Sequence, residues 1–336
     1  MTNSPLVSVI VPLYNAQKYI QQLLQTLQNQ TYENIEVLFV DDCSKDETFA
    51  NMKNILQELS DERFEIIRNE VNYGISKTKN NAIKMISGLY VMLLDQDDLL
   101  AIDAIELLMQ KAINDSCDYV VGNYVREYDY ERKFYDKIFE FQPKMQESNG
   151  KLLSEIPSLL VTIHQALWAK IYKIDILKDF VFDESLHGVE DLGSTSILLA
   201  KSHKIGVVSK VIYYYQYSKG STINEANSSY VVTDTFNAYN NVYNYYEAED
   251  LVEKYISELE YLYVYHCVLS VLVRTYQRTE NYQKSVKYVY EELERRFPKY
   301  KENIYYKKHL KISKWFIVLN KNILVQKVVS KILCQR

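Results

Sequence analysis

Residues 89–98 read LYVMLLDQDD, a run of six apolar or aromatic residues that ends in three acids and one amide. A short apolar run bounded by polar residues is typical of a strand buried on both faces of a sheet. In an open α/β sheet, ligands bind beyond the carboxyl ends of the strands. Asp95, Asp97 and Asp98 therefore mark the end of this strand as a candidate ligand site.

The residues around this stretch alternate between predicted strands and predicted helices. Apolar runs predict strands, and apolar residues three or four positions apart predict amphipathic helices. The predicted strands are Val7–Val11, Ile35–Val40, Phe64–Ile67, Leu89–Leu94 and Tyr119–Val121, with helices at Ile20–Leu27, Phe49–Leu59, Ser76–Ser87 and Ala104–Ala112. Pro12 is expected to end the first strand, and Gly88 to follow the third helix as its cap. This alternation predicts an α/β fold with a mostly parallel, twisted sheet flanked by helices.

The rest of the chain divides into an irregular part and a helical part. Residues 126–160 are polar and irregular, whereas Ala166–Tyr172 and Ile205–Tyr215 are predicted to be extended and Asp191–His203 helical. From about Thr233 the pattern is helical only, and its many tyrosines are expected mainly in a core. We therefore predict one domain over residues 1–228, in halves that meet near residue 125, and an α-helical extension over residues 229–336.

Two more strand ends carry polar residues. Pro12, Tyr14 and Asn15 follow the first strand, and Asp41 and Asp42 follow the second. Together with the acids after Leu94, they bring five carboxylates to one edge of the sheet, where like charges repel. A divalent cation would relieve the repulsion, and an oxygen-only site suits Mg²⁺ or Mn²⁺, whose shell is usually completed by water and phosphates. The pattern predicts a diphosphate held through a metal.

These acids also have a structural interpretation. A bare D-x-D occurs by chance in a chain of this length, so its position after an apolar strand carries the argument. Asp95, Asp97 and Asp98 are alternatively N-caps for a helix that begins near Ala101. One of the two acids after Val40 is alternatively a cap for the helix that begins near residue 46.

Composition and missing motifs exclude several classes of protein. Lys and Arg number 39 and Asp and Glu 44, a net charge of −5 that argues against nucleic acid as a partner. The sequence has no G-x-G, no phosphate loop, no G-x-S-x-G and no H-E-x-x-H, which disfavours dinucleotide enzymes, P-loop enzymes, serine hydrolases and zinc hydrolases. Four widely spaced cysteines and an N-terminus without signal-peptide features lead us to expect a cytoplasmic location and no membrane span.

The C-terminal tail differs in charge from the rest of the chain. Residues 299–336 hold ten basic residues and one acid, a net charge of +9 that leaves −14 on the other 298 residues. Ile312, Phe316, Leu319 and Ile323 share one helical face, with lysines roughly opposite. This is the pattern of a basic amphipathic helix lying on anionic lipid. A helix packed on the domain with its lysines in water explains the pattern equally well.

Six segments, taken in order, resemble signatures of the family-2 glycosyltransferases of GT-A (Rossmann-like) fold. Four of them are VSVIVPLYNAQKYI (7–20), VLFVDDCSKDET (37–48), NYGISKTKNNAI (72–83) and VMLLDQDD (91–98). Two more, WAKIYKIDIL (168–177) and FDESLHGVEDL (182–192), resemble the acceptor side of the family. The resemblance covers about residues 5–220, and implies a nucleotide-sugar half over about 1–125 and an acceptor half over about 126–228.

The resemblance implies a UDP-sugar donor and a base pocket at the first two strand ends. Pro12, Tyr14 and Asn15 match the positions that line this pocket, and Tyr14 would stack on uracil. Asp42 would accept a hydrogen bond from the base, and Asp41 is the less certain member of the pair.

The resemblance also implies a metal site and a base. Asp95 would approach the ribose and the metal, and Asp97 would be the principal ligand of Mn²⁺ or Mg²⁺. Asp191 would be the catalytic base, with Glu190 beside it, in an inverting single displacement that needs one carboxylate base. The structural alternative for Glu190 and Asp191 is to cap the helix that follows them.

Four residues are candidates for contact with the acceptor. His164, Trp168 and Lys170 precede the second acceptor-side segment, and His187 lies within it. Trp168 is either a platform for a sugar ring or a core residue, and His164 is alternatively a structural histidine.

One position departs from the family pattern. Many relatives carry an Arg after the strand Tyr213–Tyr215, in a loop that closes over the diphosphate, whereas this chain has Gln216, followed by Lys219 and Ser221. Lys219 is a possible source of the positive charge, although a lysine lacks the two-pronged guanidinium.

These observations predict a metal-dependent, inverting, single-addition glycosyltransferase that moves one hexose or N-acetylhexosamine from a UDP-sugar to a glycan hydroxyl. A lipid-linked precursor of a bacterial surface polysaccharide is the favoured acceptor, at the inner face of the membrane. The alternatives are the same chemistry on a protein-linked glycan such as a serine-rich glycoprotein, a non-catalytic GT-A protein that binds or stabilises a partner, and a nucleotidyltransferase, which would normally carry a Gly-rich loop near its N-terminus.

Overall fold

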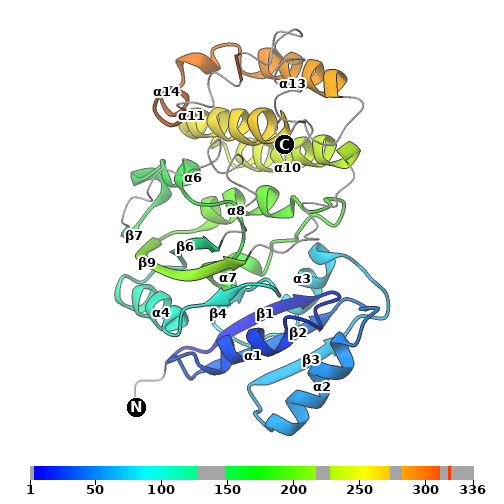
Figure 1. The fold of residues 1–336 in the computed structure, drawn as a ribbon. Coiled ribbons are helices and arrows are strands. Elements are labelled where there is room, and N and C mark those ends of the chain that lie inside the picture. The colour runs from blue at the N-terminus through cyan, green and yellow to red at the C-terminus, as the bar shows by residue number, and fades with distance from the viewer. Residues whose placement is uncertain (1–3, 128–147, 217–227, 273–281, 311–316, 319–336) are drawn as a thin grey trace.

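The computed structural model describes residues 4–127, 148–216, 228–272, 282–310 and 317–318, and a mixed β-sheet lies at its centre (Figure 1). Within these residues the sheet has nine strands in the order β3-β2-β1-β4-β8-β6-β9-β5, and β7 pairs with β9. The strands are β1 (Val7–Leu13), β2 (Ile35–Asp41), β3 (Phe64–Arg68), β4 (Tyr90–Leu93), β5 (Leu99–Leu100), β6 (Tyr119–Glu127), β7 (Asn149–Lys151), β8 (Lys170–Lys173) and β9 (Ile205–Gln216).

The strands β3, β2, β1 and β4 pair in parallel, as the alternating pattern predicted. Each is followed by a helix or by the acidic turn, so their carboxyl ends meet at one edge of the sheet. Strand β8 runs antiparallel to both β4 and β6, and β6 pairs in parallel with β9. The helices of this part are α1 (Ile20–Gln28), α2 (Thr48–Leu59), α3 (Ile75–Ile83), α4 (Ala104–Asn114), α6 (Leu159–Thr162), α7 (Ile174–Leu177) and α8 (Glu190–Lys201).

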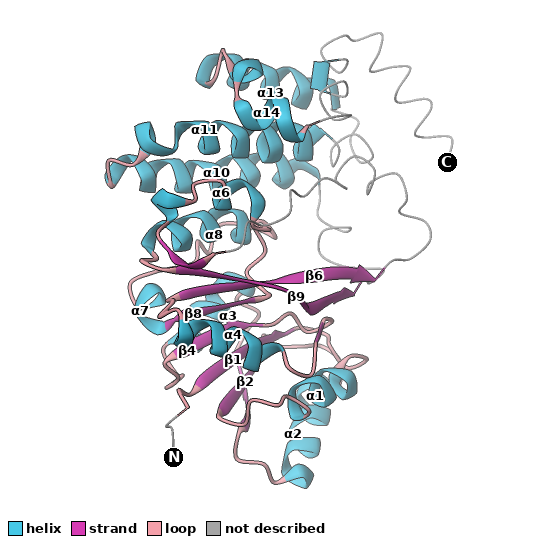
Figure 2. Ribbon diagram, turned by 90° about the vertical axis from the view of Figure 1, so that its left-hand side faces the viewer, coloured by secondary structure: helices cyan, strands magenta, loops and turns pink. Residues whose placement is uncertain are grey.

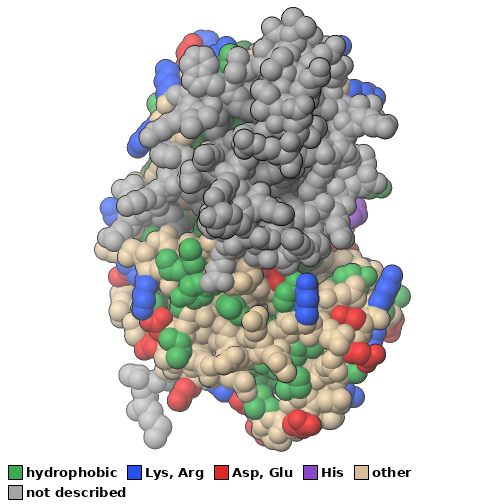
Figure 3. Space-filling model, viewed as in Figure 1, with side chains coloured by type: hydrophobic (Ala, Val, Ile, Leu, Met, Phe, Trp, Pro, Cys, Tyr) green, Lys and Arg blue, Asp and Glu red, His purple; other side chains and the backbone are tan. Residues whose placement is uncertain are grey.

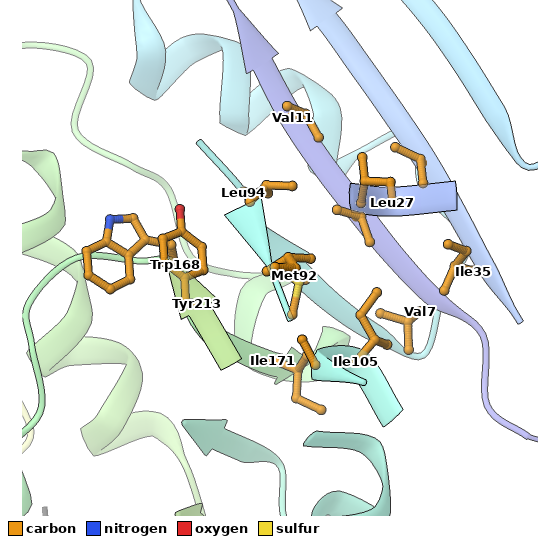
Figure 4. Close-up of a cluster of buried hydrophobic side chains, with 14 of the residues drawn as sticks. Val7, Val11, Leu27, Ile35, Met92, Leu94, Ile105, Trp168, Ile171 and Tyr213 are labelled. Carbon is orange, nitrogen blue, oxygen red and sulfur yellow. The ribbon is translucent and has the colours of Figure 1, made fainter. Parts of the chain in front are cut away.

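Side chains of β1 alternate between two hydrophobic cores, one on each face of the sheet. Val7 and Val11 lie in the core that also contains Leu27 of α1 and Ile105 of α4, shown in Figure 4. Ile10 belongs to the other core, which residues of α8 and α10 complete. Both faces of β1 are thus covered, which explains its continuous apolar sequence.

The C-terminal helices stack at the end of the molecule farthest from β2 and β3 (Figures 1 and 2). They are α10 (Ser228–Ala248), α11 (Val252–Leu262), the π-helix Tyr263–Ser270, α13 (Tyr282–Arg296) and α14 (Ile304–His309). Tyr239, Tyr261, Tyr263 and Tyr300 are buried in their shared core, which confirms that these tyrosines are core residues. Helix α10 also packs on α8, so the domain boundary near residue 228 stays a prediction.

Two findings concern the basic tail and membranes. The apolar face predicted for the tail, residues 312, 316, 319 and 323, lies outside the described residues, but Ile317 is buried in the core of the C-terminal helices. Where the chain is described, no helix combines the length and apolar character needed to cross a bilayer. On the face shown in Figure 3, acidic and basic side chains are interspersed over the sheet-bearing part.

Two predictions about where a strand and a helix end were wrong. Strand β1 runs through Pro12 to Leu13, because β4 pairs with β1 only as far as Ile10 and leaves one side of Pro12 without a strand partner. Helix α3 ends at Ile83, so Gly88 is not its cap. A Cβ atom at Gly88 would lie 2.3 Å from Ser8 Oγ and 2.6 Å from Ser8 N, so glycine permits close approach to β1.

Candidate active site

The ends of β1, β2 and β4 are tied together by hydrogen bonds between their loops. The backbone N–H of Tyr14 donates to Gln96 Oε1 at 2.8 Å, which joins the end of β1 to the acidic turn after β4. Asn15, in a left-handed conformation with φ of 50°, donates its backbone N–H to Ser44 Oγ and accepts from Lys45 N through its own Oδ1, both at 2.9 Å. These polar residues therefore form one connected edge, as the sequence predicted.

Asp42 holds the loop that begins α3. Its Oδ1 accepts hydrogen bonds from Asn69 Nδ2 at 2.8 Å and Tyr73 N at 2.9 Å, and its Oδ2 accepts from Gly74 N at 2.8 Å. Gly74 has a φ of 84°, a conformation that favours glycine. Since a carboxylate can accept about four hydrogen bonds, Asp42 keeps one acceptor position on Oδ2.

Asp41 is buried beside it and is only partly satisfied. Its Oδ2 accepts from Ser44 N at 3.2 Å and lies 3.3 Å from Arg68 Nε. Its Oδ1 has no hydrogen-bond partner among the described residues. Neither aspartate caps α2, whose N-terminal residue Thr48 donates its backbone N–H to Asp46 instead.

Asp98 serves a structural purpose at this edge. Its carboxyl group accepts from the Tyr213 hydroxyl at 2.5 Å and from Gln216 N at 2.7 Å, which fastens the end of β9 to the acidic turn. Burial raises the pKa of Asp98 to about 9, with a contribution from the charge of Asp95. Helix α4 begins at Ala104 after Asp103, so the acids of the turn do not cap it.

A buried lysine lies where α3 meets α8. Lys79 Nζ is 3.0 Å from Glu190 Oε1 and 3.7 Å from Asp191 Oδ1. Burial opposes the charge of this ammonium group, but the carboxylates of Glu190, Asp191 and Asp95 together raise the pKa of Lys79 above its usual value. Lys79 therefore connects the acidic turn after β4 with the start of α8.

Asp191 lies in the first turn of α8, with 32% of its side chain exposed. Burial raises the pKa of Asp191 to about 6, and Glu190 adds to the rise, whereas Lys79, Lys170 and a backbone hydrogen bond from Leu167 oppose it. Its Oδ1 has no hydrogen-bond partner among the described residues. Val189 is the N-cap of α8 and no side chain caps the helix, so the capping alternative is not observed.

Asp95 and Asp97, in the turn after β4, are the residues that the sequence predicted to hold a divalent cation. Burial raises the pKa of Asp95 to about 7, Asp191, Asp97 and Glu190 contribute to the rise, and Lys79 lowers it. A cation beside Asp95 would favour its charged form. In the part of the chain that the structure describes, no three His, Cys, Asp or Glu side chains are grouped to hold a metal. Phosphate or water oxygens would therefore have to complete the shell.

The residues predicted to contact the acceptor lie in different environments, some buried and one exposed. Trp168 is 4% exposed and stacks on Tyr213, with ring centroids 4.5 Å apart, so it is a core residue (Figure 4). His164 also stacks on Trp168, with ring centroids 4.9 Å apart, and burial holds the pKa of His164 well below its usual value. His187 is 69% exposed, and its Nδ1 lies 3.1 Å from Asp234 Oδ2 of α10.

Lys170 is 1% exposed, and its ammonium group donates to three backbone carbonyls. Lys170 is therefore buried against the backbone of residues 164–168, not on a surface where an acceptor could reach it. Gln216 ends β9 and is held by Asp98, whereas Lys219 and Ser221 lie outside the described residues.

Lys79, Gln96 and Tyr213 were missed as site residues. Lys79 shares the helical spacing of Ile75, Thr78 and Ala82, so a charged residue falls on a face that a helix normally buries. That position was the available signal of a buried ion pair. The partners of Gln96 and Tyr213 lie 82 and 115 residues away, and no local pattern indicates them.

The fold of this chain is similar to that of solved glycosyltransferases of GT-A fold. Residues 8–169 match the family described as Glycosyl transferase family 2, so this part of the chain is a family-2 glycosyltransferase domain. The fold is similar to TarS residues 1–349 from S. aureus, solved in complex with UDP-GlcNAc, with a TM-score of 0.58, 20% identity, and 87% and 91% of the two chains covered. It is also similar to the mannosyltransferase PcManGT from Pyrobaculum calidifontis, solved with GDP-Man and Mn²⁺, with a TM-score of 0.56, 15% identity, and 98% and 88% covered.

Two curated relatives give the sequence comparison. The glycosyltransferase GlyA of Streptococcus pneumoniae is 31% identical over 219 residues, which are 64% of this chain and 31% of that protein. The GalNAc(5)-diNAcBac-PP-undecaprenol beta-1,3-glucosyltransferase of Campylobacter jejuni is 31% identical over 188 residues, 55% of this chain and 57% of that protein. The chain spans less than half the length of the first two curated relatives that it matches.

Proposed function

We propose that the chain is a metal-dependent, inverting glycosyltransferase that moves one hexose or N-acetylhexosamine from a UDP-sugar to a glycan hydroxyl. The observation that carries this proposal is the convergence of Asp95 and Asp191, from two distant segments, around the buried cation of Lys79. This arrangement supports the proposal of a base beside the strand end that would hold the diphosphate.

The donor would bind along the connected ends of β1, β2 and β4. Tyr14 is 37% exposed and offers a ring face for uracil, with Pro12 and Asn15 shaping the same loop. The free acceptor position on Asp42, or the unpartnered Oδ1 of Asp41, would take a hydrogen bond from the base. These features favour a nucleotide over a purely apolar ligand.

Asp97 and Asp95 would hold Mn²⁺ or Mg²⁺ together with the diphosphate. When bound, such an ion stabilises negative charge on the departing nucleotide as a Lewis acid. Asp98 is given a different role, because its carboxyl group accepts from Tyr213 and Gln216 and so joins the end of β9 to the turn. Its contribution would be to fix the turn that presents the two ligands.

Asp191 would take the proton of the acceptor hydroxyl as that oxygen attacks the anomeric carbon from the face opposite UDP. With a pKa near 6, the carboxylate is ionised at neutral pH yet is a stronger base than an exposed aspartate. Glu190 would keep Lys79 in place, and Lys79 would hold Asp191 beside Asp95.

The acceptor is proposed to be a lipid-linked glycan. The Campylobacter jejuni relative is named for a glycan on undecaprenol diphosphate, and the net charge of +9 on residues 299–336 suits an anionic membrane surface. A protein-linked glycan is the second candidate, favoured if the tail packs on the domain as Ile317 does.

The test is UDP release from the purified full chain with UDP-glucose, UDP-galactose, UDP-GlcNAc and UDP-GalNAc, each with Mn²⁺, Mg²⁺ or EDTA. We expect metal-dependent release with preference for one sugar. Release that is unaffected by EDTA would contradict the metal assignment. No binding or release with any of the four sugars and either metal would contradict the donor assignment, and would favour a non-catalytic GT-A protein.

A further inference from the structure

The segment from His164 to Ala169 carries no regular secondary structure, although the sequence predicted an extended segment from Ala166. It ends in a left-handed residue, Ala169, with φ of 55°. A non-glycine residue in this region is uncommon and costs on the order of 1 kcal/mol, so the surrounding contacts must hold it there. The hydrogen bonds of the segment show which contacts do so.

Every backbone carbonyl of the segment accepts a hydrogen bond, and the acceptors alternate between two groups of donors. Lys170 Nζ donates to the first, third and fifth carbonyls, and a hydroxyl or a strand N–H donates to the others. The bonds are His164 O 3.1 Å, Ala166 O 2.5 Å and Trp168 O 3.1 Å from Lys170 Nζ, Gln165 O 2.5 Å from Thr195 Oγ1, Leu167 O 2.9 Å from Tyr172 Oη, and Ala169 O 2.9 Å from Gly122 N.

The side-chain amino group of Lys170 matches the three backbone carbonyls that surround it. Burial lowers the pKa of Lys170 to about 7, and the charge of Asp191 opposes this shift. In its ammonium form the group has three N–H donors and no acceptor, and the three carbonyl oxygens satisfy all three donors. The side chain is 1% exposed, so water cannot replace these bonds if the ammonium group is removed. Three buried carbonyls would then lack a partner, which disrupts local structure more than the loss of an exposed contact.

The same segment is attached to the helix that carries Asp191. Thr195, which holds the Gln165 carbonyl, lies one helical turn after Asp191 on α8. The charge of Lys170 also acts on the Asp191 carboxyl group, whose pKa the backbone of Leu167 lowers. The segment is therefore fixed to β8 by Lys170 and to the helix of the candidate base by Thr195.

From this geometry we infer that Lys170 is a positioning residue: its ammonium group fixes the backbone of residues 164–169, and this segment, held by Thr195, positions the first turn of α8 that carries the Asp191 carboxylate. The inference rests on the proposed function in that Asp191 is taken as the base. Lys170 itself does not touch the acceptor. The charged or titratable groups that act on Asp191 are Lys79 of α3, Glu190 of α8, Asp95 after β4, and Lys170 and Tyr172 of β8.

The test compares Lys170→Met with Lys173→Met, a control lysine on the same strand that is 40% exposed and pairs with Asp175. Hydrogen–deuterium exchange of peptides covering residues 160–172 is measured in the full chain, without substrate. We expect exchange of residues 164–169 to be at least about tenfold faster in Lys170→Met and unchanged in Lys173→Met. Equal exchange in the two variants would overturn the inference.

A second readout separates positioning from a merely structural role. With the UDP-sugar that the wild type hydrolyses fastest, Lys170→Met should bind UDP and Mn²⁺ as the wild type does. The acid limb of its kcat profile should move to higher pH by about one unit, because Asp191 loses a nearby cation. Faster exchange with an unchanged kcat profile would overturn the positioning role.

A further variant keeps the inference testable. If Lys170→Met does not fold, Tyr172→Phe is used instead, because it removes only the donor to the Leu167 carbonyl. We expect faster exchange of residues 166–168 and a smaller shift of the acid limb of the kcat profile. No change in exchange or in the kcat profile would overturn the inference. If the wild type releases no UDP, the proposed function has failed, and exchange still decides: Lys170→Met should loosen the segment and Lys173→Met should not. Unchanged exchange in Lys170→Met would overturn the inference.

Discussion

The edge formed by the ends of β1, β2 and β4 and the segment of residues 164–169 are built in different ways. At the edge, each polar residue follows an apolar strand, and the parallel order of the strands brings the residues together. Residues 164–169 have no regular secondary structure, and donors from three other elements of the fold hold their carbonyls. The first kind of site follows from topology, and the second depends on individual long-range contacts.

This difference predicts which substitutions affect chemistry and which affect folding. Residues at the edge should mainly change donor and metal binding. Residues that join the edge to the acceptor side should change stability or turnover with little effect on donor binding. The predictions below run from the largest expected effect to the smallest.

The largest effect is expected for Asp191→Asn. Loss of the carboxylate removes the proposed base, and general base catalysis typically contributes about 10²–10⁴-fold. UDP release or transfer should therefore fall by that factor in kcat. Asp175→Asn, at an exposed carboxylate near the end of β8, is the matched control and should keep wild-type turnover. Activity of Asp191→Asn within threefold of the wild type would contradict the assignment of the base.

The next effect concerns the buried ion pair that joins the two regions. Lys79→Met leaves Glu190 buried without its cation, which should cost about 3–5 kcal/mol of unfolding free energy. Lys77→Met changes a lysine on the same helix that is 39% exposed and lies 3.7 Å from Glu184, and should cost under about 1 kcal/mol. Urea denaturation of both variants measures the difference, and similar midpoints would contradict the bridging role of Lys79.

The pH dependence tests the acceptor side without a substitution. The folded pKa of Asp191 is raised to about 6, so the carboxylate becomes protonated and inactive as pH falls through that value. The kcat should be nearly constant just above pH 7 and fall about tenfold per unit well below pH 6. Steady-state rates from pH 4.5 to 8, with tryptophan fluorescence as a check on folding, give the profile. A rate that stays constant down to pH 5 would contradict a base of this pKa.

A smaller effect is expected where β9 is fastened to the edge. Tyr213→Phe removes the hydroxyl donor to Asp98 and leaves a buried carboxyl group short of one partner, at a cost of about 1–3 kcal/mol. The neighbouring half-buried Tyr214 gives the control Tyr214→Phe. Thermal unfolding of the two variants should differ by several degrees. Equal melting temperatures would show that this hydrogen bond does not stabilise the turn.

The edge could be predicted from the sequence because each strand and the polar residues that follow it are adjacent in the chain. The apolar runs ending at Val11, Val40 and Leu94 located the strands, and the alternation with helices predicted their parallel order. The polar residues after each strand followed directly. The errors at Pro12 and Gly88 arose because a strand that lacks a neighbour tolerates proline, and because a glycine can serve close packing rather than a helix end.

The acceptor side was harder to predict because its interactions span large sequence separations. Lys170 was predicted to face the acceptor, but its three acceptors are backbone carbonyls, which no side-chain pattern indicates. The sequence left open whether Trp168 is a platform for a sugar ring or a core residue. Its stacking on Tyr213 shows that it is a core residue. The contact between His187 and Asp234 joins the acceptor half to a helix of the C-terminal region, which the sequence treated separately.

The central claim is that the donor edge and the acceptor-side base act separately, and binding of UDP tests it most directly. Isothermal titration of UDP in the presence of Mn²⁺ is measured for the wild type, Asp97→Asn and Asp191→Asn. The account predicts that Asp97→Asn loses at least about tenfold in affinity, because a ligand of the metal and diphosphate is gone, and that Asp191→Asn binds UDP as the wild type does. Equal losses in both variants, or wild-type affinity in Asp97→Asn, would contradict it.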